Sequence, residues 1–351
     1  MKMKATLAIA AALNLAAYAG APVPPSPAPM RNWFPEDMPG NITIGTKLSE
    51  HLSGVYLDSM LGLWAPTNRD GYLFLDSRYH YEDNNQFISS TGLGFRTITP
   101  CKNFIVGANV YMDGIDSAHD NNFNQLGLGL EVLSRWVDVR FNYYLPEDDQ
   151  YEVGRSTSRS SSVFTRDSFQ NGVGSRTTTT TNRKQLFKQF EAALEGYNAE
   201  IGFLIPGIPE RFETRLFAGY YHYENPFGSD FEGFKARLET HLLKGVIAGV
   251  EYWDDARLMG GHWTAELSAS VPFSVENLVK GRNPFVGFAD SFKPAKRELQ
   301  DRLGDMVIRS HRVQTTTSGN ILTNDVRSSV TTQQVGVRGA GFAGGVGPAL
   351  E

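Results

Sequence analysis

The sequence predicts an all-β fold, a transmembrane β-barrel of about twelve antiparallel strands with a C-terminal helix in or near its pore. Three observations lead to this prediction. Segments of about ten residues alternate apolar and polar side chains, aromatic residues gather at many segment ends, and the segments are even in number. Because successive strand residues point to opposite faces, each segment has one apolar and one polar side, as strands between lipid and a wet lumen require.

Composition excludes several other classes of protein. The 351 residues carry a net charge of -5, and only 20% of them are charged. This balance lacks the basic excess that neutralises phosphates, so nucleic acid is not an expected partner. The single cysteine, Cys101, cannot form an intramolecular disulfide and is expected to be an inert thiol. No cofactor and no metal ion is expected.

The N-terminus predicts export from the cytoplasm. Lys2 and Lys4 precede an apolar run over residues 5–17, which indicates a secretory signal peptide over residues 1–19. The Pro-rich stretch 20–40 is expected to be a linker. The apolar run is too short to span a bilayer as a helix and no other such run follows, so any membrane segment must consist of strands.

The alternation of apolar and polar residues covers residues 41–273. In the segment 125–132, for example, every even position is leucine or valine, whereas glutamine, glycine and glutamate occupy the odd positions. Most segments are long enough to cross a bilayer at the usual tilt. The predicted strands are Asn41–Ser49, Gly54–Ala65, Gly71–Glu82, Gln86–Ile98, Asn103–Asp113, Asn124–Leu133, Trp136–Leu145, Gln189–Ile205, Phe212–Glu224, Phe231–Leu243, Val246–Asp254 and His262–Phe273.

The lengths of the connections favour a membrane barrel over a soluble sandwich, which would alternate in the same way. If the N-terminus is periplasmic, every second connection must be a short periplasmic turn, and all of those connections are short. The three longest connections fall on the opposite side. The longest of them, 146–188, is rich in Ser and Thr and is expected to be a low-complexity extracellular loop without regular structure.

The polar faces of the predicted strands carry charges of both signs, which predicts a hydrated lumen with opposite charges across neighbouring strands. These charges are spread over many strands, so paired-carboxylate catalysis is not expected and the chain is not predicted to be an enzyme. Leu128→Arg on the apolar face should impair insertion far more than Glu131→Ala in the lumen. The residues predicted to face the lumen are Asp138, Arg140, Glu131, Glu213, Arg215, Arg237, Glu251 and Glu266.

After residue 273 the apolar period becomes helical. The run 295–309 predicts an amphipathic helix, and Pro294 suits its first turn. A surface helix on a soluble core is the alternative, but on a barrel the helix is expected to plug the pore, so 274–313 is interpreted as plug helix and linker. The remaining 314–351 form a short tail that is compatible with an extended path through the lumen. The predicted plug residues are Arg297, Glu298, Leu299, Leu303, Asp305, Val307 and Arg309.

Two sets of residues resemble a known family. The stretches Gly107–Asp113, Asn124–Glu131 and Phe141–Pro146 resemble the core of the intimin and invasin β-domain, the inverse autotransporter type. The run after the barrel is similar to the helical signature of that family. It comprises Leu303, Asp305, Met306, Val307, Arg309 and Val313.

The resemblance implies an outer-membrane barrel with a periplasmic N-terminus, whose pore holds the helix and a linker to a surface passenger, often an adhesin. It further implies outer-membrane lipid, the barrel assembly machinery and periplasmic chaperones as partners, while a receptor stays unidentified. The chain departs from the family in lacking a periplasmic peptidoglycan-binding module before the barrel and in its short tail. The expected function is a translocator and anchor for the C-terminal segment. A passive outer-membrane pore with a plugged lumen and no passenger is the alternative.

Overall fold

The chain falls into two compact units. One comprises residues up to Asp149 together with Ala192–Thr316, and the other comprises Gln150–Glu191 together with the chain from Thr317 onward. The expected signal peptide and almost all of the expected linker lie outside the described residues. The computed structural model describes residues 40–50, 53–66, 70–83, 85–147, 149–208, 212–254, 261–294, 297–319 and 321–337.

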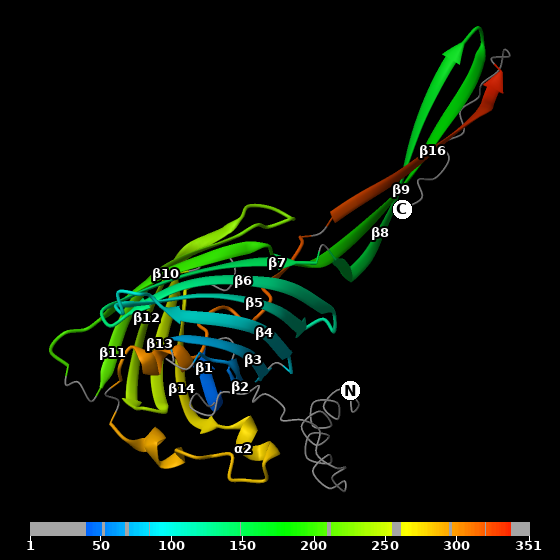
Figure 1. The fold of residues 1–351 in the computed structure, drawn as a ribbon. Coiled ribbons are helices and arrows are strands. Elements are labelled where there is room, and N and C mark those ends of the chain that lie inside the picture. The colour runs from blue at the N-terminus through cyan, green and yellow to red at the C-terminus, as the bar shows by residue number, and fades with distance from the viewer. Residues whose placement is uncertain are drawn as a thin grey trace, which may run out of the picture. The chain divides into compact units, whose positions relative to one another are not determined.

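The first unit contains a closed antiparallel barrel, which in the described residues has twelve strands (Figure 1). Strands adjacent in the chain are neighbours in the barrel, except that β7 is followed by β10, and the ring closes where β1 pairs with β14. The strands are β1 Gly40–Ser49, β2 Gly54–Trp64, β3 Gly71–Glu82, β4 Phe87–Ile98, β5 Phe104–Asp116, β6 Asn122–Ser134, β7 Val137–Pro146, β10 Gly196–Leu204, β11 Glu213–Tyr223, β12 Phe231–Leu243, β13 Val246–Asp254 and β14 His262–Phe273.

The predicted twelve-strand barrel is thus confirmed, with one strand misplaced. The strand predicted over Gln189–Ile205 begins too early, because β9 (Val173–Ala193) runs into this range and β10 begins only at Gly196. Between them, the backbone N–H of Leu194 donates to the carbonyl of Gln314, 2.9 Å away, instead of to a barrel strand. A new strand therefore begins at Gly196.

The barrel is apolar outside and polar inside. In β6, Leu126, Leu128 and Leu130 are exposed, whereas Gln125 and Glu131 on the opposite face are buried. Because the ring is closed, both edges of every barrel strand are paired. A membrane-spanning backbone requires this, since the bilayer core contains no water to hydrogen-bond with its N–H and C=O groups. No helix in the described part of the chain is long and apolar enough to cross a membrane.

The second unit contains a long hairpin of β8 (Gln150–Gln170) and β9. The expectation of a loop without regular structure over 146–188 is therefore wrong. Asn171 and Gly172 connect the strands with φ angles of 50° and 83°, and Asn-Gly is the pair that favours a two-residue hairpin turn with positive φ. The low-complexity run also contains many β-branched threonines, which suit strands.

The tail also differs from its expected path. Residues Ile321–Val337 form β16, which pairs antiparallel with β9, and β15 (Thr315–Thr317) joins the same sheet. Residues Ile321–Val337 are therefore a strand of the sheet of the second unit. Near the base of the hairpin, hydrogen bonds from Arg155 and then Lys188 lower the pKa of the Glu152 carboxyl to about 2.

The helix predicted over 295–309 is wrong. The helical elements among the described residues after β14 are a short helix, α2 (Val275–Val279), and two 3-10 turns, η2 (Phe288–Phe292) and η3 (Gln300–Gly304). The physical reason is that side chains of the barrel wall donate hydrogen bonds to backbone carbonyls of this segment, such as those of Leu303 and Asp305. These carbonyls therefore have the partners that a helix would otherwise provide. Leu303 and Val307 produced the helical spacing because both are buried in the same apolar cluster.

Candidate functional site

The barrel interior is occupied by residues 297–314, here called the lumen segment. The barrel has a turn end, where the short connections such as Lys244-Gly245 lie, and a loop end, where β7 leads to β8. After β14 ends at the turn end, η2 stays there, since the N–H of Gly245 donates to the carbonyl of Ser291 at 2.8 Å. The lumen segment therefore enters at the turn end.

Two arginines of the lumen segment bind carboxylates near the turn end. Arg297 donates to both oxygens of Glu213 at the start of β11, at 2.9 and 3.1 Å. Arg302 donates to both oxygens of Asp138 in β7, at 2.9 and 2.7 Å. Asp305 adds a carboxylate within the segment, which accepts hydrogen bonds from both arginines. Such forked pairs fix orientation as well as charge.

Two further arginines bind carboxylates near the loop end. Arg309 donates to both oxygens of Asp113 in β5 at 2.6 Å each, and both side chains are completely buried. The Arg309 guanidinium also lies over the rings of Tyr111 and Tyr144. Arg312 pairs with Glu82 at the end of β3. The four arginines thus bind carboxylates on four different strands, and the segment crosses the lumen from one end to the other.

The wall also binds the backbone of the segment. Arg96 of β4 donates to the carbonyls of Leu303, at 3.0 Å, and Asp305. The other side of its guanidinium is held by both oxygens of Glu131, at 2.6 and 3.2 Å. In β7, Tyr144 accepts a hydrogen bond from the N–H of Ser310 at 2.8 Å. The segment is therefore positioned by its main chain as well as by its charges.

Apolar and small residues complete the fit. Leu303 and Val307 pack in a buried cluster with residues of β2 to β6. Gly127 of β6 leaves room for Arg309, because a Cβ at this glycine would lie 1.8 Å from Arg309 Nη2. Gly129 likewise faces Asn109, with a Cβ distance of 2.3 Å to its Oδ1. The glycines of this strand make space in the lumen rather than bends.

The remaining predicted lumen residues join a charge network on the wall. Arg140 and Arg237 both donate to Glu200 Oε1, at 2.9 and 2.8 Å. Arg215 donates to Glu213 Oε1 at 2.9 Å, which links it to the carboxylate that binds the lumen segment. The network joins predicted charges of β7, β11 and β12 across neighbouring strands, with Glu200 of β10, which was not predicted, between them.

The predicted plug residues have unequal roles. Leu303, Val307 and Arg309 are buried, and Leu299 packs at the edge of the apolar cluster. Glu298 is exposed and takes part through its backbone: its N–H donates to an Asp301 oxygen at 2.9 Å, and its carbonyl accepts the N–H of Asp301 at 3.1 Å.

Sequence reasoning missed several residues of the site. Asp113 and Arg96 have the strand parity of the polar face, so the alternation was a signal that could have found them. Glu82 ends a correctly predicted strand. Neither the strand alternation nor the helical period after residue 273 singled out Arg302 or Arg312.

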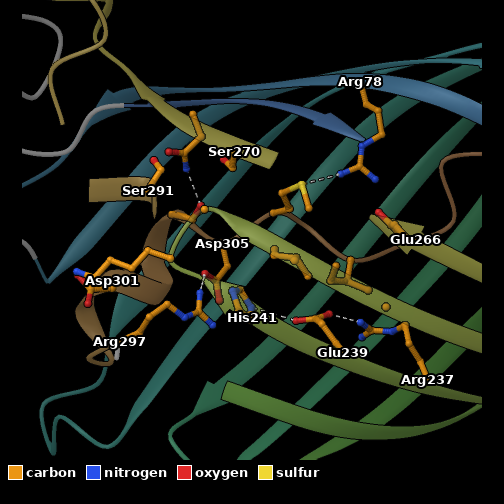
Figure 2. A pocket seen from close by; sticks show the side chains of 18 of the residues that line it. Arg78, Arg237, Glu239, His241, Glu266, Ser270, Ser291, Arg297, Asp301 and Asp305 are labelled. Atoms are coloured by element: carbon orange, nitrogen blue, oxygen red, sulfur yellow. Dashed lines mark hydrogen bonds and ion pairs between the residues drawn. The ribbon is translucent and has the colours of Figure 1, made fainter. Parts of the chain in front are cut away.

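A cavity of about 620 Å³ remains beside the lumen segment, toward β12 to β14 and β1. Among the predicted lumen residues that line it, Glu251 lies 3.8 Å from Lys235 and Glu266 lies 3.8 Å from Lys47. Figure 2 shows wall residues Arg237, Glu239 and Glu266 across this space from Arg297, Asp301 and Asp305. The described residues contain no group of three or more His, Cys, Asp or Glu side chains that could hold a metal ion.

A closed twelve-strand barrel that is apolar outside and polar inside defines an outer-membrane β-barrel. Residues 30–255 match the model of the inverse autotransporter β-domain, and the chain belongs to that family. The match covers β1 to β13 and confirms the family expected from the sequence. The protein is accordingly located in the outer membrane.

Among the similar solved structures, one with a TM-score of 0.57 supports the fold. A solved structure from work on the in-meso crystallization of membrane proteins is 15% identical, covers 80% of this chain and 100% of its own, and has a TM-score of 0.57. The KdgM porin in complex with disordered oligogalacturonate is 9% identical, with coverages of 66% and 99% and a TM-score of 0.37. The β-domain of the Bordetella autotransporter BrkA is 12% identical, with coverages of 65% and 96% and a TM-score of 0.25. No curated protein sequence matches the chain.

Proposed function

We propose that this barrel is a translocator that passes its own C-terminal segment through the lumen to the cell surface and then anchors it there. The observation that carries the proposal is the path of the lumen segment, from Arg297 near the turn end to Arg312 near the loop end. In this proposal the turn end is periplasmic and the loop end is extracellular, the usual arrangement of short turns and long loops. Catalysis has no part in the mechanism.

The ion pairs explain why the segment stays in place after passage. Removing one partner of a buried pair costs about 3–5 kcal/mol, because the other charge is left without compensation. Withdrawal of the segment would separate the pairs of Arg297, Arg302, Arg309 and Arg312 and strip Arg96 of its carbonyl partners. Water that enters the empty lumen would offset part of this cost, but the loss involves many contacts at once.

The driving force for insertion resides in the outer face of the barrel. Residues such as Leu128 and Val139 are exposed on this face, and burying apolar surface in lipid contributes about 25 cal/mol per Å². The proposed partners are outer-membrane lipid, the barrel assembly machinery and periplasmic chaperones. An adhesive role would require a receptor for the residues carried outside.

Fractionation with surface labelling tests the proposal. An epitope after Glu351 in intact cells should be reached by antibody and removed by external protease, while the barrel stays in the outer-membrane fraction. An epitope protected in intact cells and accessible only after lysis would overturn the proposal. N-terminal sequencing of the membrane-bound protein checks the proposed removal of residues 1–19.

The second candidate function is a passive pore, which the cavity of about 620 Å³ beside the lumen segment favours. In that case the segment is only a plug, and small solutes pass beside it. A pore should conduct ions in planar bilayers while its C-terminal epitope stays inaccessible from outside. A translocator should show the opposite combination.

A further inference from the structure

We infer that the free edge of β9 is the receiving surface for the exported chain, which it captures as the strand β16 when the chain leaves the pore. The inference rests on the proposed translocator function. It gives a role to the long hairpin of β8 and β9, whose strands are not part of the barrel ring. The captured partner is residues Ile321–Val337 of the same chain.

The pairing between β9 and β16 is long and mostly regular. It runs antiparallel from Ile321 opposite Lys188 to Val337 opposite Val173, with one irregularity near Gln334. Figure 1 shows β16 beside β9 along most of the hairpin. β9 has β8 on its other edge, so it is the central strand of this sheet and uses both of its edges.

Side chains across the two strands match as well. The hydroxyls of Thr177 and Thr332 lie 3.3 Å apart, and those of Thr181 and Ser328 lie 3.2 Å apart. Gln185 donates to Asn324 at 3.2 Å. These contacts repeat every four residues along β9 and add side-chain hydrogen bonds to the backbone pairing.

Hydrogen bonds between the exported chain and the β9 region begin where the lumen segment ends. Gln314 accepts a hydrogen bond from the N–H of Leu194 at 2.9 Å, directly after β9 and before β10. Four residues later, Ser318 donates its N–H to the carbonyl of Phe190 at 2.7 Å and accepts the N–H of Phe190 on its hydroxyl at 2.8 Å. The exported chain therefore has backbone partners from the last residue of the lumen segment onward.

The hairpin is suited to be in place before its partner arrives. It is closed by the local Asn171-Gly172 turn, and hairpins form within microseconds, whereas the contacts of β16 join residues far apart in sequence. Until then the β9 edge has unpaired N–H and C=O groups, which is the property that lets an edge template another strand. Each residue that pairs opposes backward sliding, so capture gives export a direction without nucleotide hydrolysis.

Cysteine cross-linking tests the pairing. In a full-length Cys101→Ser background, Thr179→Cys with Val330→Cys places the two thiols on directly opposed residues. Oxidation of intact cells should join them. The control pair, Thr179→Cys with Val326→Cys, is offset by four residues and should not react. Equal linking of both pairs, or of neither, on cells whose C-terminal epitope is accessible would overturn the inference.

Kinetics test the role of the pairing in export. We would replace residues 153–188 by Asn-Gly and, in a second variant of full length, introduce Thr179→Pro, which removes a backbone donor from the central strand. Pulse-labelled cells should expose the C-terminal epitope several-fold more slowly in both variants, with the barrel still heat-modifiable. Unchanged exposure in either assembled variant would refute capture. An epitope that never becomes accessible in the unmodified protein would instead refute the proposed function.

Discussion

Arg309 and Asp113 are an ion pair with no exposed side-chain surface. Asp113→Asn should destabilise the folded protein by about 3–5 kcal/mol, because it leaves the guanidinium buried without a counter-charge. The double variant Asp113→Leu with Arg309→Met should recover much of this loss. The heat-modifiable gel shift, followed against temperature, measures both. A double variant no better than Asp113→Asn would contradict the assignment of the loss to an uncompensated charge.

Leu128 lies midway along β6 on the lipid face. Leu128→Arg should reduce the stability of insertion by about 2–4 kcal/mol, as expected of a charge near the bilayer midplane. The matched control is Glu251→Ala, which borders the cavity and has a lysine 3.8 Å away. Glu131→Ala is not a mild control after all, because Glu131 holds Arg96. Similar unfolding temperatures for the Leu128 and Glu251 variants would contradict the facing of β6.

At the scale of elements, the hairpin turn offers a separate test. Gly172 has a φ of 83°, and a β-branched residue there is strained by about 1–2 kcal/mol. Gly172→Val should open the tip of the hairpin and speed its cleavage by external protease. Asn171→Gly is the control, since glycine adopts positive φ readily. Equal cleavage rates for these two variants would argue against the turn as described.

The elements that the sequence predicted well are those whose environment imposes a pattern. β3, β12, β13 and β14 agree with prediction at both ends, because lipid on one side and lumen on the other force strict alternation. The lumen segment has no such pattern, since its path depends on donors such as Arg96 from distant strands. The hairpin was missed because its composition outweighed the Asn-Gly signal at residues 171–172.

On the scale of the whole molecule, the lumen segment decides whether the pore of the barrel is blocked. Truncation after Pro294 should leave a barrel that folds, because all twelve strands precede that residue, and should raise ion conductance in planar bilayers several-fold over the full chain. The gel shift of the truncated protein provides the folding control. Equal conductance of a folded truncated barrel and the full-length protein would mean that residues 297–314 do not limit flow.

The lumen segment lies against β3 to β7 and β11, and the cavity borders β12 to β14 and β1. The two halves of the wall should therefore differ in how freely they accept change. Random mutagenesis with selection for surface display should recover many inward-facing substitutions from the cavity half and very few from β4 to β7. If the barrel is the proposed translocator, this half of the wall is where the lumen can change shape without loss of the contacts that hold residues 297–314.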